Sequence, residues 1–227
     1  MNAVDLKPNY RKIYGIARER FGKTTHFKHG PYDETYYTLL VYESAKEIIR
    51  KLNRPVRVQQ VLVASLLHDI GKTRLRASRM FARDHVLDNV KEEWHRHELL
   101  GGPVARSILK KLGHSNAFVD EVVYLVENHA NRGGKLKDKS IELQVLQDAD
   151  LVADCGFASF IRPFLFCGKF SRHNVIDSIK FIQKEENRVN KKHLLNLAVS
   201  RQIAKKKVAL QERLVSEISK DIKSDLI

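Results

Sequence analysis

The chain has 227 residues, of which 43% are hydrophobic and 30% are charged, a balance typical of a globular protein rather than of a disordered chain. No apolar run approaches the roughly 20 residues that span a bilayer, and residues 1–21 lack the apolar centre of a secretory signal, so we expect a cytoplasmic protein. The two cysteines form no CxxC pair, which argues against a disulfide framework. The net charge of +14 suits an anionic substrate or nucleic acid, but the basic residues are spread over most predicted helices without interleaved aromatic residues, which disfavours nucleic-acid binding as the main function.

Two amphipathic helices are predicted in the first quarter of the chain. The first covers residues 8–21, and Gly22 ends it. A loop over residues 22–31, which contains His26 and His29, leads to Asp33, a suitable N-cap for the second helix. The second helix ends before Pro55, and its apolar face is formed by Tyr37, Leu40, Val41, Ala45, Ile48 and Ile49.

The stretch from Val61 to Lys72 organises the rest of the chain. Residues 61–67 contain one hydroxyl and no charge, which predicts a helix buried on most of its faces. His68 and Asp69 then enter apolar surroundings, where a carboxylate needs a partner: either a metal ion binds both, or they hydrogen-bond each other and cap a core helix. We expect Gly71 to end the helix in the left-handed conformation and Lys72 to lie at the rim, where it can meet an anion.

Further histidines follow on the next predicted helices. Residues 73–90 read as a long loop or short helices that form a lid. His97 precedes Gly101-Gly102-Pro103, which we expect to open a helix that Gly113 closes. Ser115 caps the next helix, whose apolar residues lead to His129, so His129 should face inward.

An acidic cluster lies on the helix predicted over residues 141–152 and capped by Ser140. Asp150 and Asp154 share one face whereas Asp148 points elsewhere, so at most two of them serve one site. The aromatic stretch 157–170, interrupted by Pro163 and Gly168, is expected to fill the core near that site. A helix near 175–182 and a long C-terminal helix with a heptad-like pattern follow, and the latter packs against the body or mediates a homodimer. No strand pattern is visible, so we predict an all-α fold.

The spacing of these residues carries a family resemblance. His68-Asp69, His97, His129 and Asp150 each lie at or near the end of an apolar helical segment. In this order they resemble the HD superfamily of metal-dependent phosphohydrolases, whose pattern is His, then His-Asp, then one or two further His, then Asp on a later helix. The closest matches to its motifs are Leu67-His68-Asp69-Ile70-Gly71-Lys72, His97-Glu98-Leu99-Leu100-Gly101 and Asp148-Ala149-Asp150-Leu151.

The resemblance implies an HD-type helical bundle over residues 1–227, with a metal-site core at about 26–170 and a helical extension at about 174–227. It implies a divalent metal held by His68, Asp69 and Asp150, and a second one if His97 and His129 also bind. Fe, Mn, Co, Ni, Zn and Mg are not distinguished. The implied reaction is hydrolysis of a nucleotide or another small phosphoester by metal-bound hydroxide. Asp69 and Lys72 would be catalytic, and Lys72 and Arg74 would bind the substrate. Without a second metal, His97 or His129 could instead contact phosphate or protonate the leaving group.

One position departs from the family pattern. The family's first ligand is a histidine on the helix before the His-Asp helix, and Tyr37 occupies that position here. A protonated phenol is a poor ligand for most divalent ions, so either the site lacks a ligand or Glu34, His26 or His29 substitutes. Two other functions therefore stay open: a di-iron oxygenase, and a degenerate nucleotide- or RNA-binding module without turnover.

Overall fold

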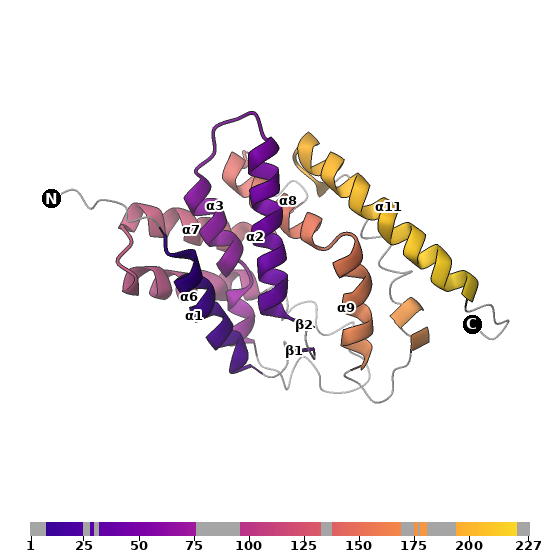
Figure 1. Ribbon diagram of the computed structural model, residues 1–227. Helices are drawn as coiled ribbons and strands as arrows, with labels where there is room; N and C mark the ends of the chain where they lie inside the picture. Colours follow the sequence, from indigo (N-terminus) through magenta and orange to yellow (C-terminus); the bar gives the residue numbers. More distant parts are fainter. Residues whose placement is uncertain are drawn as a thin grey trace.

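The computed structural model describes residues 8–24, 28–29, 32–75, 96–132, 138–168, 175–176, 178–180 and 194–221. Within these ranges the chain is almost entirely helical, which confirms the all-α prediction (Figure 1). The α-helices are α1 (Tyr10–Gly22), α2 (Glu34–Lys51), α3 (Val58–Leu67), α6 (His97–Lys111), α7 (Asn116–Asn128), α8 (Ile141–Ala153), α9 (Phe157–Gly168) and α11 (Ala198–Asp221). A 3-10 helix, η2 (Ile70–Arg74), follows α3. In the loop before α2, β1 (Lys28–His29) and β2 (Tyr32–Asp33) form a two-residue antiparallel ladder.

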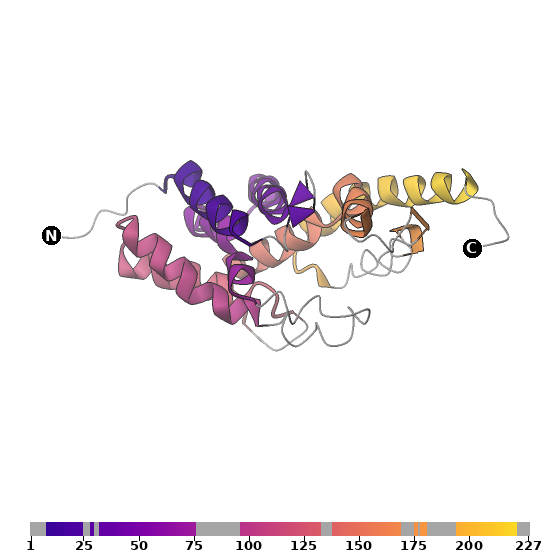
Figure 2. The same cartoon turned by 90° about the horizontal axis from the view of Figure 1, so that it is seen from below.

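Helix α3 lies at the centre of the bundle. Every residue from Val61 to Leu67 is buried, as predicted, and α3 contacts α1, α2, α7 and α8. Figure 2 shows α6 and α7 side by side at one end of the molecule and α9 and α11 at the other. A helix that is apolar on all faces is stable only when other helices surround it, so the chain that leaves α3 at His68 enters the interior.

Local capping signals place the helices on either side of α3. The side chain of Ser115 accepts a hydrogen bond from the backbone N–H of Phe118, and Ser140 does the same for Leu143, at 3.3 and 3.2 Å. Gly113, predicted to close α6, has φ +83°, the left-handed conformation that glycine often adopts after the end of a helix. The N-terminal caps of α7 and α8 and the end of α6 therefore agree with the sequence prediction.

Helix α6 begins earlier than predicted. It runs continuously from His97, so Gly101-Gly102-Pro103 lies inside the helix instead of opening it. Pro103 has no N–H for the carbonyl of Leu99, but Leu99 is 67% exposed, so water can satisfy that carbonyl. A Cβ on Gly101 would lie 2.9 Å from the side chain of Val126, so glycine at this position lets α6 pack closely on α7.

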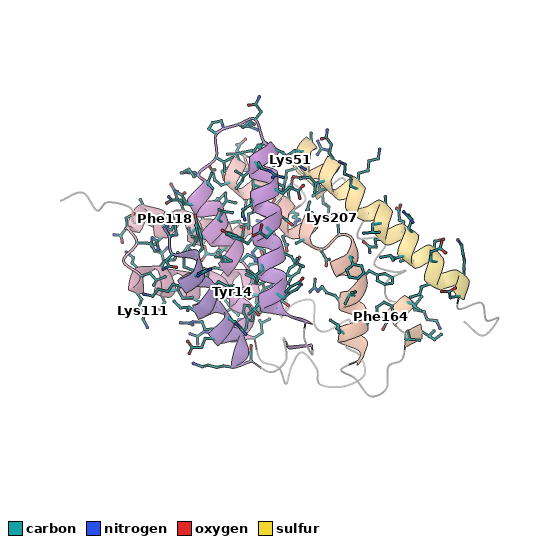
Figure 3. All side chains as sticks on the ribbon, in the orientation of Figure 1. Tyr14, Lys51, Lys111, Phe118, Phe164 and Lys207 are labelled. Atoms are coloured by element: carbon teal, nitrogen blue, oxygen red, sulfur yellow. The ribbon has the colours of Figure 1, made fainter. Side chains whose placement is uncertain are left out.

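The described aromatic side chains of residues 157–170 lie outside the core, contrary to the prediction, although Leu165 packs against the core. This stretch forms α9, with Pro163 inside the helix, and Phe157 is 57% exposed while Phe160 and Phe164 are half-buried. Figure 3 labels Phe164 on α9. Helix α11 packs on α8, α9 and α2 of the same chain, and Lys207 Nζ donates to the carbonyl of Val152 in α8 at 3.2 Å. The C-terminal helix therefore packs against the body, one of the two predicted arrangements.

Two predictions fall partly or wholly outside the described residues. The lid predicted over residues 73–90 is described only as far as Leu75, which is buried behind η2. The helix predicted near 175–182 is described at residues 175–176 and 178–180, which are helical. None of the helices among the described residues combines the length and apolarity that crossing a membrane would need.

Candidate metal centre

Two histidines enter the interior by the same local geometry. His68 directly follows α3, and its Nδ1 donates to the carbonyl of Ser65 at 2.9 Å. His129 directly follows α7, and its Nδ1 donates to the carbonyl of Val126 at 2.7 Å. In both cases the carbonyl three residues earlier fixes the ring and its tautomer, so that the neutral imidazole presents the Nε2 lone pair inward.

The third histidine arrives through a close backbone contact. A Cβ on Gly71 would lie 1.9 Å from the carbonyl oxygen of His97 and 2.5 Å from the backbone nitrogen of Gly101. Only glycine allows η2 to approach the first turn of α6 this closely. Gly71 does not adopt the predicted left-handed conformation, because the chain continues as a 3-10 helix after Asp69. Its function in the structure is to bring His97 against Asp69.

Asp69 is the point on which the three rings converge. Its Oδ1 lies 3.2 Å from His97 Nε2 and 3.7 Å from His129 Nε2. Its Oδ2 lies 3.1 Å from His68 Nε2. The Nε2 atoms of His97 and His129 are 3.2 Å apart. These distances show the predicted convergence of His68, Asp69, His97 and His129. All four side chains are also buried.

The cluster has the chemistry of a divalent metal site. His68 Nε2 is buried and makes no well-directed hydrogen bond among the described residues, although Asp69 Oδ2 is nearby. Ligand atoms of His68, Asp69 and His129 all lie within 4.8 Å of one another. Several imidazole and carboxylate lone pairs turned towards one point repel one another unless a proton or a cation lies between them. These residues therefore fit a metal ion that accepts nitrogen and oxygen ligands.

The charges of the cluster are strongly coupled. Burial works against the charged form of His68, but the carboxylates of Asp69 and Asp150 outweigh it and raise the pKa of His68 to about 9. Burial likewise disfavours ionised Asp69, yet His68 and Lys72 hold the pKa of its carboxyl well below the usual value. Burial lowers the pKa of His129, and the neighbouring His68 and His97 act in the same direction. A metal ion that binds here must therefore displace a proton from His68.

Asp150 lies beside the cluster but is held by two other residues. Its Oδ1 is 3.7 Å from His68 Nε2 and accepts a hydrogen bond from the hydroxyl of Tyr37 at 2.7 Å. Its Oδ2 accepts one from Arg132 at 2.6 Å. Burial and the nearby Asp150 and Asp154 raise the pKa of Tyr37, so the phenol stays protonated and donates. At the position where the family pattern has a histidine ligand, this chain has a hydrogen-bond donor that fixes Asp150.

Lys72 is buried and does not lie at the rim, contrary to the sequence prediction. Its side chain is 6% exposed, and Nζ donates to Asp69 Oδ2 at 2.7 Å and also to Glu34 Oε1. Of the three proposed substitutes for the missing ligand, Glu34 is linked to Asp69 through Lys72, which donates a hydrogen bond to both carboxylates. His26 lies outside the described residues, and only the backbone of His29 is described.

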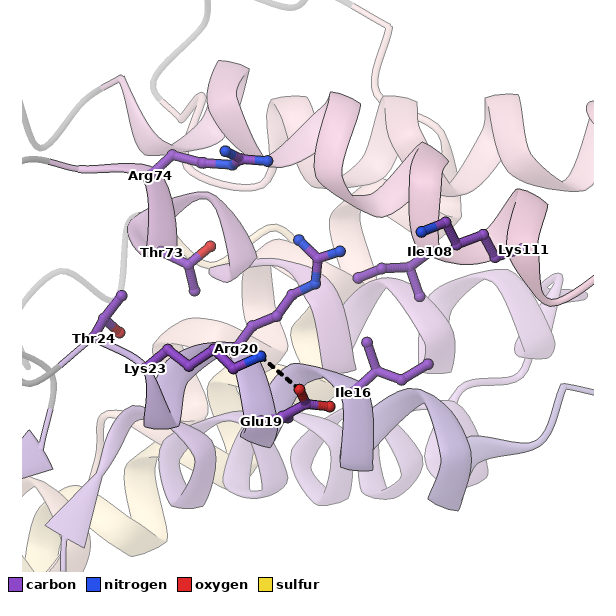
Figure 4. A pocket seen from close by; sticks show the side chains of 9 residues that line it. All are labelled: Ile16, Glu19, Arg20, Lys23, Thr24, Thr73, Arg74, Ile108 and Lys111. Atoms are coloured by element: carbon purple, nitrogen blue, oxygen red, sulfur yellow. Dashed lines mark hydrogen bonds and ion pairs between the residues drawn. The ribbon is translucent and has the colours of Figure 1, made fainter.

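The other predicted acidic and basic residues point away from the cluster. Asp148 accepts backbone hydrogen bonds from Asn196 and Leu197 at 2.7 and 2.8 Å and so anchors the start of α11. Asp154 pairs with Arg162 at 2.8 Å. The prediction that Asp148 points away from Asp150 is confirmed. Arg74 is exposed and lines a separate hollow (Figure 4).

Sequence reasoning missed the two arginines around Asp150 and Tyr37. Arg132 binds Asp150, and the guanidinium carbon of Arg162 lies 4.3 Å from the centre of the Tyr37 ring. The sequence offers one signal for Arg132: it lies three residues after His129, close to a predicted site residue. Nothing local marks Arg162, because its contact with Tyr37 joins α9 to α2.

Comparison with known proteins identifies the family. The HD domain family matches residues 36–153, more than half of the chain and the whole span from Tyr37 to Asp150. The chain therefore belongs to the HD superfamily, a family of metal-dependent hydrolases. A search of curated protein sequences gives no match.

Solved structures share the fold at low sequence identity. YpgQ from Bacillus subtilis, in complex with ADP, has a TM-score of 0.61 and 18% identity over 95% of this chain and 99% of that chain. An HD-superfamily hydrolase from Bacillus thuringiensis has a TM-score of 0.61 and 16% identity over 95% and 97%. The Lin1889 protein from Listeria innocua has a TM-score of 0.58 and 16% identity over 95% and 98%.

Proposed function

We propose that this protein is a metal-dependent phosphohydrolase that acts on a nucleotide or another small phosphoester. The observation that carries the proposal is the convergence of His68, His97 and His129 on Asp69 in a buried cluster whose donor atoms suit a divalent ion. The HD family assignment and the ADP bound to the similarly folded YpgQ support it.

The residues of the cluster bind and support a metal ion in this proposal. The three imidazoles and Asp69 hold the metal. Asp150 is oriented by Tyr37 and Arg132, and its Oδ1 lies 3.7 Å from His68 Nε2, where it can act as a further metal ligand. A divalent ion bound there supplies Lewis acidity for phosphoester hydrolysis. His97 and His129 also remain candidates to contact a phosphoryl oxygen or to hold the proton that the leaving group requires.

Lys72 acts as a positioning residue in this proposal. Its Nζ donates to the carboxylates of Asp69 and Glu34, and the side chain is too deeply buried to reach an anion at the rim. By binding Asp69 Oδ2 it keeps the carboxylate ionised and leaves Oδ1 turned towards His97 and His129. Neutralisation of Lys72 would leave Asp69 and Glu34 buried without their shared cation.

A second candidate is a nucleotide-binding module without turnover. Tyr37 favours it, because the position of the family's first ligand is filled by a phenol that donates to Asp150 instead of binding metal. In that case the cluster would hold a metal weakly or not at all, while ligand binding would persist.

Hydrolysis by wild type, Asp69→Asn and Asp120→Asn tests the proposal. The assay follows phosphate release from a panel of nucleotides and small phosphoesters after loading with Mn²⁺, Zn²⁺ or Fe²⁺. Asp120 is exposed, pairs with Arg106 and lies outside the cluster, so it serves as the matched carboxylate-to-amide control. We expect turnover by wild type and Asp120→Asn and none by Asp69→Asn. Nucleotide binding without turnover would instead favour the binding module, and oxygen consumption by the iron-loaded protein would favour a di-iron oxygenase.

A further inference from the structure

A hollow on the surface gathers positive charge from three separate elements. It has a volume of about 620 Å³ and lies between α1, η2 and α6. Its lining residues are Ile16, Glu19, Arg20, Lys23, Thr24, Thr73, Arg74, Ile108 and Lys111 (Figure 4). Four of them are cationic and one is acidic, so the lining has a net charge of +3.

Within the described part of the chain, the cations of the hollow outnumber the carboxylates that could neutralise them. Glu19 pairs with Lys23 at 2.7 Å and is therefore already used. Among the described residues, Arg20, Arg74 and Lys111 form no ion pair with a carboxylate, and only Arg20 is close enough to Glu19 to be attracted by it. Like charges that the fold brings together repel one another, and a bound anion relieves that repulsion. Other arginines in the bundle are paired, for example Arg57 with Glu142 and Arg132 with Asp150.

The chemistry of the lining favours phosphate groups. Arginine presents a planar fork of donors that matches phosphate oxygens, and lysine adds a compact charge. The hydroxyls of Thr24 and Thr73 donate to the carbonyls of Phe21 and Ile70 at 2.8 and 2.6 Å, so anion affinity rests on the cations. A hollow of about 620 Å³ has the size of an ordinary small-molecule site and can contain a polyphosphate with more than one charge.

The hollow is separate from the metal cluster. None of its lining residues belongs to the cluster, and Ile108 follows His97 by 11 positions in α6, which is about 16 Å along the helix. Arg74 and Lys72 lie in the same 3-10 helix, but Lys72 turns inward to Asp69 whereas Arg74 is exposed at the hollow.

We propose that the hollow between α1, η2 and α6 is a second binding site, which takes a small polyphosphate such as tripolyphosphate or a nucleoside triphosphate. The polyphosphate binds across Arg20, Arg74 and Lys111 and needs no metal ion. This site does not depend on the hydrolytic activity proposed above.

Calorimetry with full-length protein in EDTA at fixed ionic strength tests the site, with tripolyphosphate as the probe. We expect one binding event per chain, weakened at least about tenfold by Arg20→Gln or Lys111→Gln, because each removes a charged contact to phosphate. The matched controls are Arg18→Gln in α1 and Lys110→Gln in α6, exposed cations outside the lining. They should bind as wild type does, and so should His129→Gln in the metal cluster.

Three results would overturn this second site. They are no binding by wild type, equal weakening in the lining and control variants, and loss of binding in His129→Gln with retention in Arg20→Gln. The first removes the site, the second reduces it to general surface charge, and the third moves the anion to the metal cluster. A parallel titration with ATP distinguishes the two sources of the ligand: tighter binding than tripolyphosphate assigns a nucleotide, and equal binding assigns the polyphosphate alone.

Discussion

The close contact at Gly71 leads to the sharpest prediction about the metal centre. In Gly71→Ala the new Cβ would lie 1.9 Å from the carbonyl oxygen of His97 and 2.5 Å from the nitrogen of Gly101. Both neighbours are backbone atoms of α6, so no side-chain rotation can make room. Relief to an ordinary contact requires η2 and α6 to separate by roughly 1.5 Å at this point.

The size of the effect follows from that separation. Overpacking against fixed atoms costs about 3 kcal/mol, near the upper end of the usual range. For a chain of this length that corresponds to a fall in Tm of roughly 6–12 °C. The shift also moves His97 away from Asp69, to which its Nε2 now lies at 3.2 Å, so metal affinity should fall as well.

Thermal unfolding followed by circular dichroism, together with metal titration, measures both effects. Gly15→Ala is the matched control, because Gly15 is inside α1 and a Cβ there meets nothing within 4 Å. It should stabilise the protein by about 0.5–1 kcal/mol through helix propensity alone. If Gly71→Ala kept both the Tm and the metal affinity of wild type, the proposed role of this contact would be wrong.

Three further predictions concern α8 and its neighbours. Asp148→Ala should lower the free energy of unfolding by about 2–4 kcal/mol, because it leaves the backbone N–H groups at the start of α11 without an acceptor. The metal content of this variant should equal that of wild type, because Asp148 lies outside the metal centre. Burial opposes ionisation of Glu142, but hydrogen bonds from Arg57 outweigh it and lower the pKa of Glu142. Ionised Glu142 therefore stabilises the folded protein above its ordinary pKa of 4.5, and this stabilisation is lost as pH falls through the folded-state pKa. Urea unfolding at a series of pH values should show a shallower acid-side loss in Glu142→Gln. Tyr37→His should tighten metal binding about tenfold by restoring the family's first ligand, and calorimetry showing weaker binding would refute this.

Local sequence signals predicted the elements that carry the cluster. The uncharged run from Val61 to Leu67 could only be stable in the interior, and its end places His68 and Asp69 there. Ser115 and Ser140 identified the starts of α7 and α8, because a capping hydroxyl acts within three residues. The spacing from these caps to His129 and Asp150 then followed from helical periodicity.

Contacts between distant segments limited the prediction elsewhere. Lys72 looks like a rim residue in the sequence, and its burial depends on Glu34, 38 positions earlier. Gly71 looks like a helix terminator, and only the position of α6 shows that it permits close packing. The exposure of Phe157 reflects how α9 lies on the bundle, which its own apolar composition does not determine.

The most direct test of the metal centre is the number of divalent ions bound per chain. Wild type and His129→Gln are dialysed to equilibrium against Mn²⁺ or Zn²⁺ and measured by elemental analysis. Convergence of the three imidazoles on Asp69 predicts at least one ion per chain in wild type, with occupancy strongly reduced in His129→Gln. Wild type without a bound ion, or equal occupancy in both proteins, would contradict the account.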